Sequence, residues 1–288
     1  MMDLPPPIPK QKKNSNWGLY IGLGLLAVIV AVLAGLFAFG VYKGYQRAVE
    51  RKQAIAHMDQ QLSIEQAKVA DALRNGKSED REAAVGRMKD ELKRASEHMS
   101  DADAAAARGM ASFMGKLQAQ SRELHAAGQR LTAASVFEFK IEDRATIDEN
   151  RKLLRDFLAT NEKLTNIILH GEDLVGAELD AAGVPPKTRA AAIAGYLSTS
   201  VPNRPLMQTI RGCDKTIGET GLSVLDLLDQ NWGKWHRNAE GKLIFQDHAT
   251  VETFNGLMAK IHEASTQQKD AEQKAAARMQ AQSASHSM

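Results

Sequence analysis

The stretch from Trp17 to Tyr45 constrains this chain more than any other feature, because it is long and almost wholly apolar. No charged residue lies between Asn14 and Tyr42, and the 24 residues from Leu19 to Tyr42 include fourteen Leu, Ile, Val or Phe. As a helix they would span roughly 36 Å, enough to cross a hydrocarbon core of about 30 Å. Their insertion is favoured by about 4 to 8 kcal/mol. The sequence therefore predicts a transmembrane helix over residues 17–45.

A cleaved signal peptide is the competing interpretation of this stretch. The apolar core of a signal peptide usually has about 7–15 residues and ends at a small-x-small cleavage site. Here the core is longer, and the best candidate site, Ala38-Phe39-Gly40, matches that pattern poorly. We therefore favour an uncleaved anchor in contact with the lipid bilayer.

The charge distribution supports an anchor and bears on its orientation. Residues 1–52 carry seven basic and two acidic groups, whereas the rest of the chain carries 30 basic and 33 acidic groups. The basic excess therefore flanks the apolar stretch, which argues against nucleic-acid binding by the main domain. Basic groups on the two sides nearly balance under the positive-inside rule, but translocating the lysines of a short tail is disfavoured. We expect a single-pass inner (plasma) membrane protein with a cytoplasmic amino end and an extracytoplasmic bulk.

Small residues recur along the predicted span. Ala27, Ala31 and Gly35 are spaced four residues apart, which lets transmembrane helices approach closely. The pattern makes a dimer or a contact with another membrane or envelope protein a hypothesis. The alternative is that small residues are simply common in such helices.

The chain beyond the span has the periodicity of helices. Apolar residues follow a 3-4 spacing from Val85 to Ala134, and the two successive steps of four through Gly109, Phe113 and Leu117 form a stutter. The glycines leave open whether residues 79–135 form one continuous helix. A capping-box pattern at Thr146 predicts the start of the next helix, which we expect to end at residues 183–186.

Asn161 and Cys213 fall on apolar helix lines. Asn161 either sets the pairing register of the helices or lies at the edge of the seam. Cys213 is expected to be buried rather than reactive. Because it is the only cysteine, the chain can form neither an internal disulfide nor a cysteine-based zinc site. Residues 198–205, with two prolines, are predicted to be a loop.

Residues 232–246 interrupt the helical pattern and predict a β-hairpin with a tight turn at residues 238–241. A lone hairpin is only marginally stable, so it must lie against helices. Trp232 and Trp235 either pack this hairpin on the bundle, which we favour, or contact a partner. Asp247 can cap a last helix. From residue 266 the chain turns polar, and we expect disorder from residue 280.

No catalytic, cofactor or metal motif is recognisable in the sequence. The eight histidines form no HExxH or other close ligand pair, and there is no GxSxG, P-loop or EF-hand pattern. Acidic residues between 172 and 180 are expected to form a solvated helix face. We therefore predict no cofactor and no enzymatic activity.

Together these features predict an all-α fold in four parts. A disordered Pro/Lys-rich tail (residues 1–16) precedes the transmembrane helix (17–45), an elongated bundle of antiparallel long helices with one small hairpin (46–265) and a polar, partly disordered tail (266–288). The expected function is that of a membrane-anchored interaction or scaffold protein of a bacterial-type cell envelope. The alternative is an extracytoplasmic sensory or ligand-binding domain that signals through a partner subunit.

The small-residue face of the predicted span allows a direct test. We expect Leu at both Ala31 and Gly35 to weaken self-association several-fold in a membrane two-hybrid assay, because the larger side chains keep the helices apart. Unchanged self-association of this variant would remove the dimer hypothesis.

Overall fold

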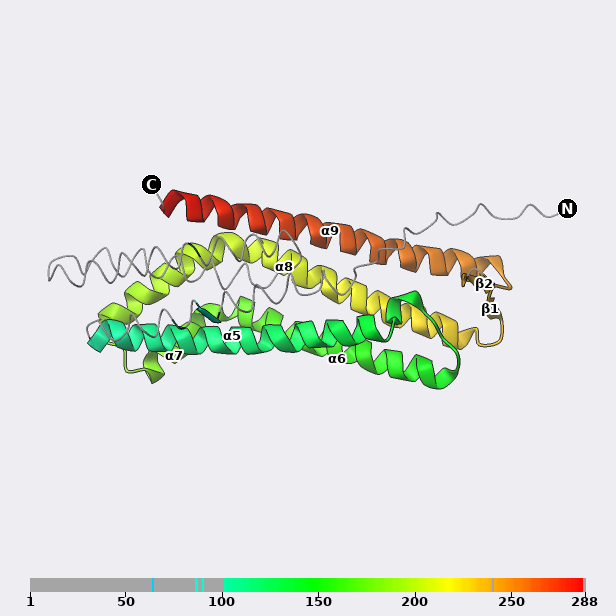
Figure 1. Cartoon of the computed structure of the whole chain (residues 1–288), viewed down its shortest axis with the longest axis horizontal. Coiled ribbons are helices and arrows are strands. Elements are labelled where there is room, and N and C mark those ends of the chain that lie inside the picture. The colour runs from blue at the N-terminus through cyan, green and yellow to red at the C-terminus, as the bar shows by residue number, and fades with distance from the viewer. Residues whose placement is uncertain (1–63, 65–85, 88–89, 91–100, 240, 287–288) are drawn as a thin grey trace.

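The computed structural model describes residues 64, 86–87, 90, 101–239 and 241–286 (Figure 1). This part of the chain is mostly helical, with one small antiparallel hairpin. The predicted span, residues 17–45, lies outside the described residues, as does most of the predicted helical pattern before residue 101. Among the helices that are described, none combines the length and apolarity needed to cross a membrane.

In the described part of the chain, the long helices run alternately up and down the molecule (Figure 1). The described elements are α5 (Asp101–Ala133), the 3-10 helix η1 (Val136–Glu138), α6 (Arg144–Leu169), α7 (Gly171–Ala181), α8 (Pro186–Gln230), β1 (Trp235–Arg237), β2 (Leu243–Phe245) and α9 (His248–His286). α8 packs against α6 on one side and α9 on another, and α5 packs against α6 and α7. The predicted helical bundle is therefore confirmed for the described residues.

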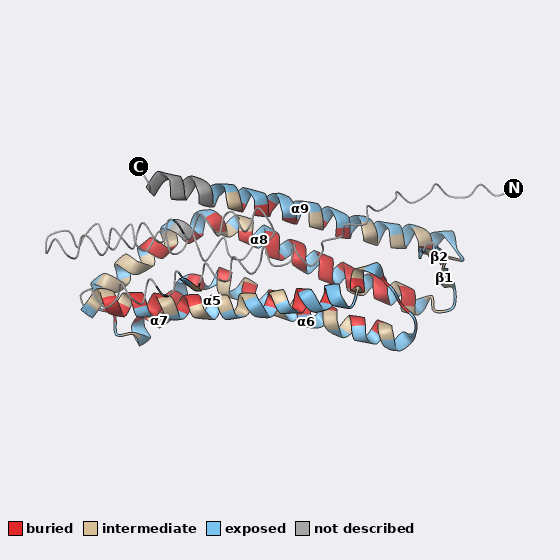
Figure 2. Cartoon of the chain, in the orientation of Figure 1, coloured by how far each residue is buried: buried red, intermediate tan, exposed pale blue. Residues whose placement is uncertain are grey.

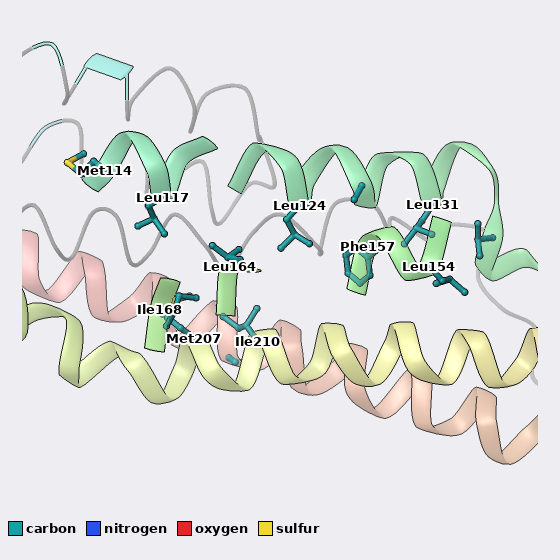
Figure 3. Close-up of a cluster of buried hydrophobic side chains, with 14 of the residues drawn as sticks. Met114, Leu117, Leu124, Leu131, Leu154, Phe157, Leu164, Ile168, Met207 and Ile210 are labelled. Atoms are coloured by element: carbon teal, nitrogen blue, oxygen red, sulfur yellow. The ribbon is translucent and has the colours of Figure 1, made fainter. Parts of the chain in front are cut away.

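The core follows the 3-4 spacing of the helices. Buried residues lie on the facing sides of the helices (Figure 2), and apolar side chains of α5 point toward α6 and α8 (Figure 3). The buried line of α6 shows the spacing without a break: Ile147, Asn150, Leu154, Phe157, Asn161, Leu164 and Ile168. This spacing keeps one face of a helix on its neighbours.

α5 runs without interruption through Gly109 and Gly115, so the region the structure describes holds one helix from Asp101 to Ala133. A Cβ at Gly109 would lie 3.0 Å from the carbonyl oxygen of Glu178 and 3.1 Å from Leu179. The glycine therefore lets α5 and α7 approach closely, and it does not break the helix.

The start of α6 differs from the capping-box prediction. The N-cap is Asp143, whose carboxylate accepts a 2.7 Å hydrogen bond from the backbone N–H of Thr146. Thr146 is the third residue of the helix and donates its own hydroxyl to the same oxygen. The helix that we expected to run to residue 183 is also divided, because α6 ends at Leu169 and α7 begins at Gly171.

The predicted loop at residues 198–205 is wrong, because α8 continues through it with Pro202 and Pro205 inside the helix. Proline removes a backbone hydrogen bond and bends a helix, and α8 is visibly bent along this part (Figure 1). Tyr196 and Met207, on either side of the prolines, are both buried. Their burial stabilises the helical path where local preference opposes it.

The hairpin and the cap of α9 are confirmed. β1 and β2 pair in antiparallel register, the backbone N–H of Gly241 donates a 2.9 Å hydrogen bond to the carbonyl oxygen of Asn238, and Gly241 has a φ of 75°. Asp247 accepts a 2.7 Å hydrogen bond from the backbone N–H of Thr250. α9 continues to His286, so residues 280–286, which we expected to be disordered, are helical. Gln268 and Ala271, within the predicted polar tail, are buried.

Gly171 is predicted to be essential for the packing of α7. A Cβ built on Gly171 would lie 1.8 Å from the hydroxyl oxygen of the buried Tyr196. We expect Gly171→Ala to lower the free energy of unfolding by about 1–3 kcal/mol, because this overpacking forces α7 and α8 apart. Chemical denaturation of the full-length protein, followed by circular dichroism, measures the effect.

Gly212→Ala is the matched control, because a Cβ at Gly212 meets no atom within 4 Å. Within a helix this change should stabilise by up to about 1 kcal/mol. Equal effects of the two substitutions would contradict the packing argument.

Candidate functional site

Trp232 and Trp235, which the sequence predicts either to pack the hairpin on the bundle or to contact a partner, lie where α8 passes into the hairpin. Their rings meet edge to face with centroids 5.5 Å apart, and Trp235 Nε1 donates a 2.8 Å hydrogen bond to the carbonyl oxygen of Leu228. The guanidinium carbon of Arg144 lies 5.7 Å from the Trp232 ring centroid. Both rings are half-buried against the core, so part of each remains at the surface.

The hairpin is also tied to the connection between α5 and α6. Arg237 Nη2 donates a 2.6 Å hydrogen bond to the carbonyl oxygen of Glu138, and the same guanidinium bonds to the carbonyl oxygens of Phe139 and Gly241. Phe254 of α9 packs on Phe139 with a centroid distance of 6.4 Å. We call this region, the hairpin with Trp232 and η1, the hairpin end of the bundle.

The other sequence-predicted contact residues, Ala27, Ala31 and Gly35, lie outside the described residues. Their role in transmembrane packing stays a prediction.

A second feature was not predicted as a site: a buried polar cluster that joins α6, α8 and α9. It consists of Asn161, Arg211, Asp214 and Gln268, none of them more than 3% exposed. Asn161 Nδ2 donates a 2.9 Å hydrogen bond to the carbonyl oxygen of Arg211. Gln268 Nε2 donates a 2.9 Å hydrogen bond to Asp214 Oδ1. The two amides therefore connect α8 to a helix on each side.

The centre of the cluster is an ion pair within α8. Arg211 Nη1 lies 2.8 Å from Asp214 Oδ2 and 3.4 Å from Asn161 Oδ1. Oδ2 nevertheless lacks a well-aligned hydrogen bond, so the contact is chiefly coulombic. Nε and Nη2 of Arg211 also have no hydrogen-bond partner among the described residues. The pair is thus buried with incomplete hydrogen bonding, which costs desolvation energy.

Burial dominates the electrostatics of this cluster. Desolvation raises the pKa of Asp214 to about 6, against the opposing effects of the Arg211 charge and the Gln268 hydrogen bond. Burial likewise raises the pKa of the neighbouring Cys213 thiol, and the negative charge of Asp214 adds to the shift. Cys213 is 5% exposed, as predicted for a buried thiol. A raised pKa disfavours the reactive thiolate.

The chemistry of the cluster suits the setting of register rather than group transfer. A charged or amide group in a seam is satisfied only when its partner lies opposite, so a shifted pairing leaves it buried alone. The sequence predicts that Asn161 either sets the pairing register or lies at the edge of the seam. Its burial places it inside the seam. Asp214 and Gln268 also lie on their helix lines, four residues after Ile210 and Ala264 respectively. Polar residues at apolar positions were therefore the available signal.

No group of metal-binding side chains occurs among the residues that the structure describes. The chain matches no family model, and neither the curated proteins nor the solved structures contain a significant match. The candidate sites therefore depend on geometry alone.

The ion pair gives a sharp stability prediction. We expect Arg211→Met and Asp214→Leu each to lower the free energy of unfolding by about 3–5 kcal/mol, because each leaves a buried charged group without its partner. The double variant should lose much less than the sum, since apolar pairs often replace buried ion pairs at little cost. Chemical denaturation of the full-length protein measures all three variants.

The exposed pair Lys215–Glu219 on the same helix, 3.7 Å apart, is the matched control. Lys215→Met and Glu219→Leu should each change stability by less than about 1 kcal/mol. Additive losses at Arg211 and Asp214 would show that the two side chains do not act as a pair.

Proposed function

We propose that this chain is a membrane-anchored scaffold or interaction protein of a bacterial-type cell envelope. One observation carries the proposal: apolar side chains fill the facing sides of α5, α6 and α8 along their length. The surfaces left for binding other molecules are then the exposed helix faces and the hairpin end. A long, internally packed bundle is suited to holding such surfaces at fixed positions.

The apolar stretch at residues 17–45 supports the tether in this proposal, on the insertion energy argued from sequence. We propose that it crosses the inner membrane once, with the amino end cytoplasmic and the bundle extracytoplasmic. The basic groups on its two sides nearly balance, and the orientation is supported by the cost of translocating the lysines of the short amino-terminal tail.

The hairpin end is the surface that best fits a protein partner. Trp232 and Trp235 remain half-exposed there, and Ile244 on β2 is 40% exposed. Aromatic residues held rigidly at a surface are the usual anchors of protein interfaces. The hydrogen bonds from Trp235 to the carbonyl oxygen of Leu228 and from Arg237 to the carbonyl oxygen of Glu138 hold the hairpin in place.

One experiment tests both the tether and the partner surface. A photo-crosslinking amino acid is placed at Ile244 in the full-length chain in cells, with a periplasm-active phosphatase reporter fused after Met288. We expect a discrete protein adduct in the membrane fraction, resistance to alkaline extraction and phosphatase activity. The adduct should form because Ile244 belongs to the proposed contact surface.

The control is the same amino acid at Val201, which is 50% exposed and lies far from the hairpin along α8. We expect no matching adduct there. Equal adducts from both positions would argue against a specific hairpin contact, and loss of the protein on alkaline extraction would contradict the tether. A reporter that is active only in the cytoplasm would reverse the orientation.

A further inference from the structure

The two halves of α9 are attached to the bundle by different kinds of contact. In the first half, the Phe254 ring packs on Phe245 and Phe139 with centroid distances of 5.2 and 6.4 Å, and Ile261 is 1% exposed. In the second half, the buried apolar side chains among residues 264–278 are the alanines at positions 264, 271 and 275. Because an alanine side chain buries far less apolar area than phenylalanine or isoleucine, the second half gains less from the hydrophobic effect.

Polar contacts to α8 help to hold the second half of α9 in place. Gln268 reaches Asp214, and Arg278 Nη1 donates a 2.7 Å hydrogen bond to the carbonyl oxygen of Pro202. Pro202 lies in the bent part of α8, and the amino-terminal part of α8 turns away from α9 beyond it (Figure 1). The Arg278 contact is therefore near the last place where the two helices run together.

Separation of this half of α9 from α8 would also remove the desolvation cost of the buried Arg211–Asp214 ion pair. Among the described residues, Arg211 Nε and Nη2 have no hydrogen-bond partner, and Asp214 is completely buried. Water reaching the ion pair would hydrate all of these groups. The gain in hydration offsets part of the apolar contact that is lost on opening.

We propose that residues 264–278 of α9 form a strap that lifts from α8 as a unit, while residues 248–261 and the hairpin stay in place. The strap covers Cys213, which forms a small apolar cluster with Ile217 and Ala264, separate from the main core. Opening the strap uncovers this side of α8. The proposal does not depend on the proposed function.

The position of Cys213 makes the test direct, because it is the only thiol in the chain. The rate at which a water-soluble disulfide reagent labels the full-length native protein reports every opening that exposes Cys213. Global unfolding is measured in parallel by circular dichroism. We expect labelling to exceed the global unfolding rate by at least about tenfold, since local openings cost less than global unfolding.

Two variants should change the labelling rate of Cys213 in opposite directions. Arg278→Ala removes the exposed hydrogen bond to the carbonyl oxygen of Pro202. It should speed labelling of Cys213 about 3- to 10-fold, with little change in the free energy of global unfolding. The apolar variant Arg211→Met/Asp214→Leu/Gln268→Leu should slow labelling, because its open state no longer gains hydration of the ion pair.

Lys274→Ala is the matched control. It removes a positive charge from an exposed position of the same strap, and among the described residues Lys274 makes no hydrogen bond or ion pair to α8. We expect its labelling rate to equal that of the unsubstituted protein. Labelling of Cys213 at the global unfolding rate, or equal rates for Arg278→Ala and Lys274→Ala, would overturn the proposal.

Discussion

The buried line of α8 is the constraint on which the other described elements depend. Met207, Ile210, Val224 and Leu228 are each fully buried, and α5, α6, α7 and α9 all pack against this helix. Removing such a line from water contributes roughly 1.5–3 kcal/mol for each large side chain. That gain explains why the helix persists through two prolines, each of which costs about 3 kcal/mol in a helix interior. The bend in α8 results from the two prolines, and the burial energy does not fully straighten it.

The polar cluster in the same seam imposes a different constraint. Apolar contacts are non-directional, so they allow packed helices to shift along one another. The Asn161 and Gln268 amides, by contrast, have hydrogen-bond partners in only one axial register of α6 and α9 against α8. The Arg211–Asp214 pair makes a shifted register costly, because the pair would then be buried without the neighbouring amides that help to compensate its charges. Apolar burial thus stabilises the bundle, and the cluster selects one arrangement of it.

The kinds of packing contact differ between the two ends of α9. The hairpin end is held by aromatic rings and by the hydrogen bonds of Arg237 and Trp235. In residues 264–278 of α9 the buried apolar side chains are alanines, and the polar contacts to α8 include those of Gln268 and Arg278. Regions with small apolar contacts open at lower free energy than regions with large ones. The same helix can therefore serve as a fixed element at one end and a movable one at the other.

The sequence by itself determined most of the helices, the hairpin and its turn, and the burial of Cys213. These features follow from local periodicity, from turn residues such as Gly241 and from side-chain caps such as Asp247, all of which act between residues close in the chain. The transmembrane prediction also follows from local apolarity, over residues that the structure does not describe.

Only the tertiary structure decided the rest. The helix through Pro202 and Pro205, the division between α6 and α7, and the helical end of α9 oppose or exceed local preference. The pairing of Gln268 with Asp214 joins residues 54 positions apart. Neither spacing nor composition encodes which distant side chains meet. That depends on how whole helix faces exclude water together, and a polar residue becomes part of a site only when this packing encloses it.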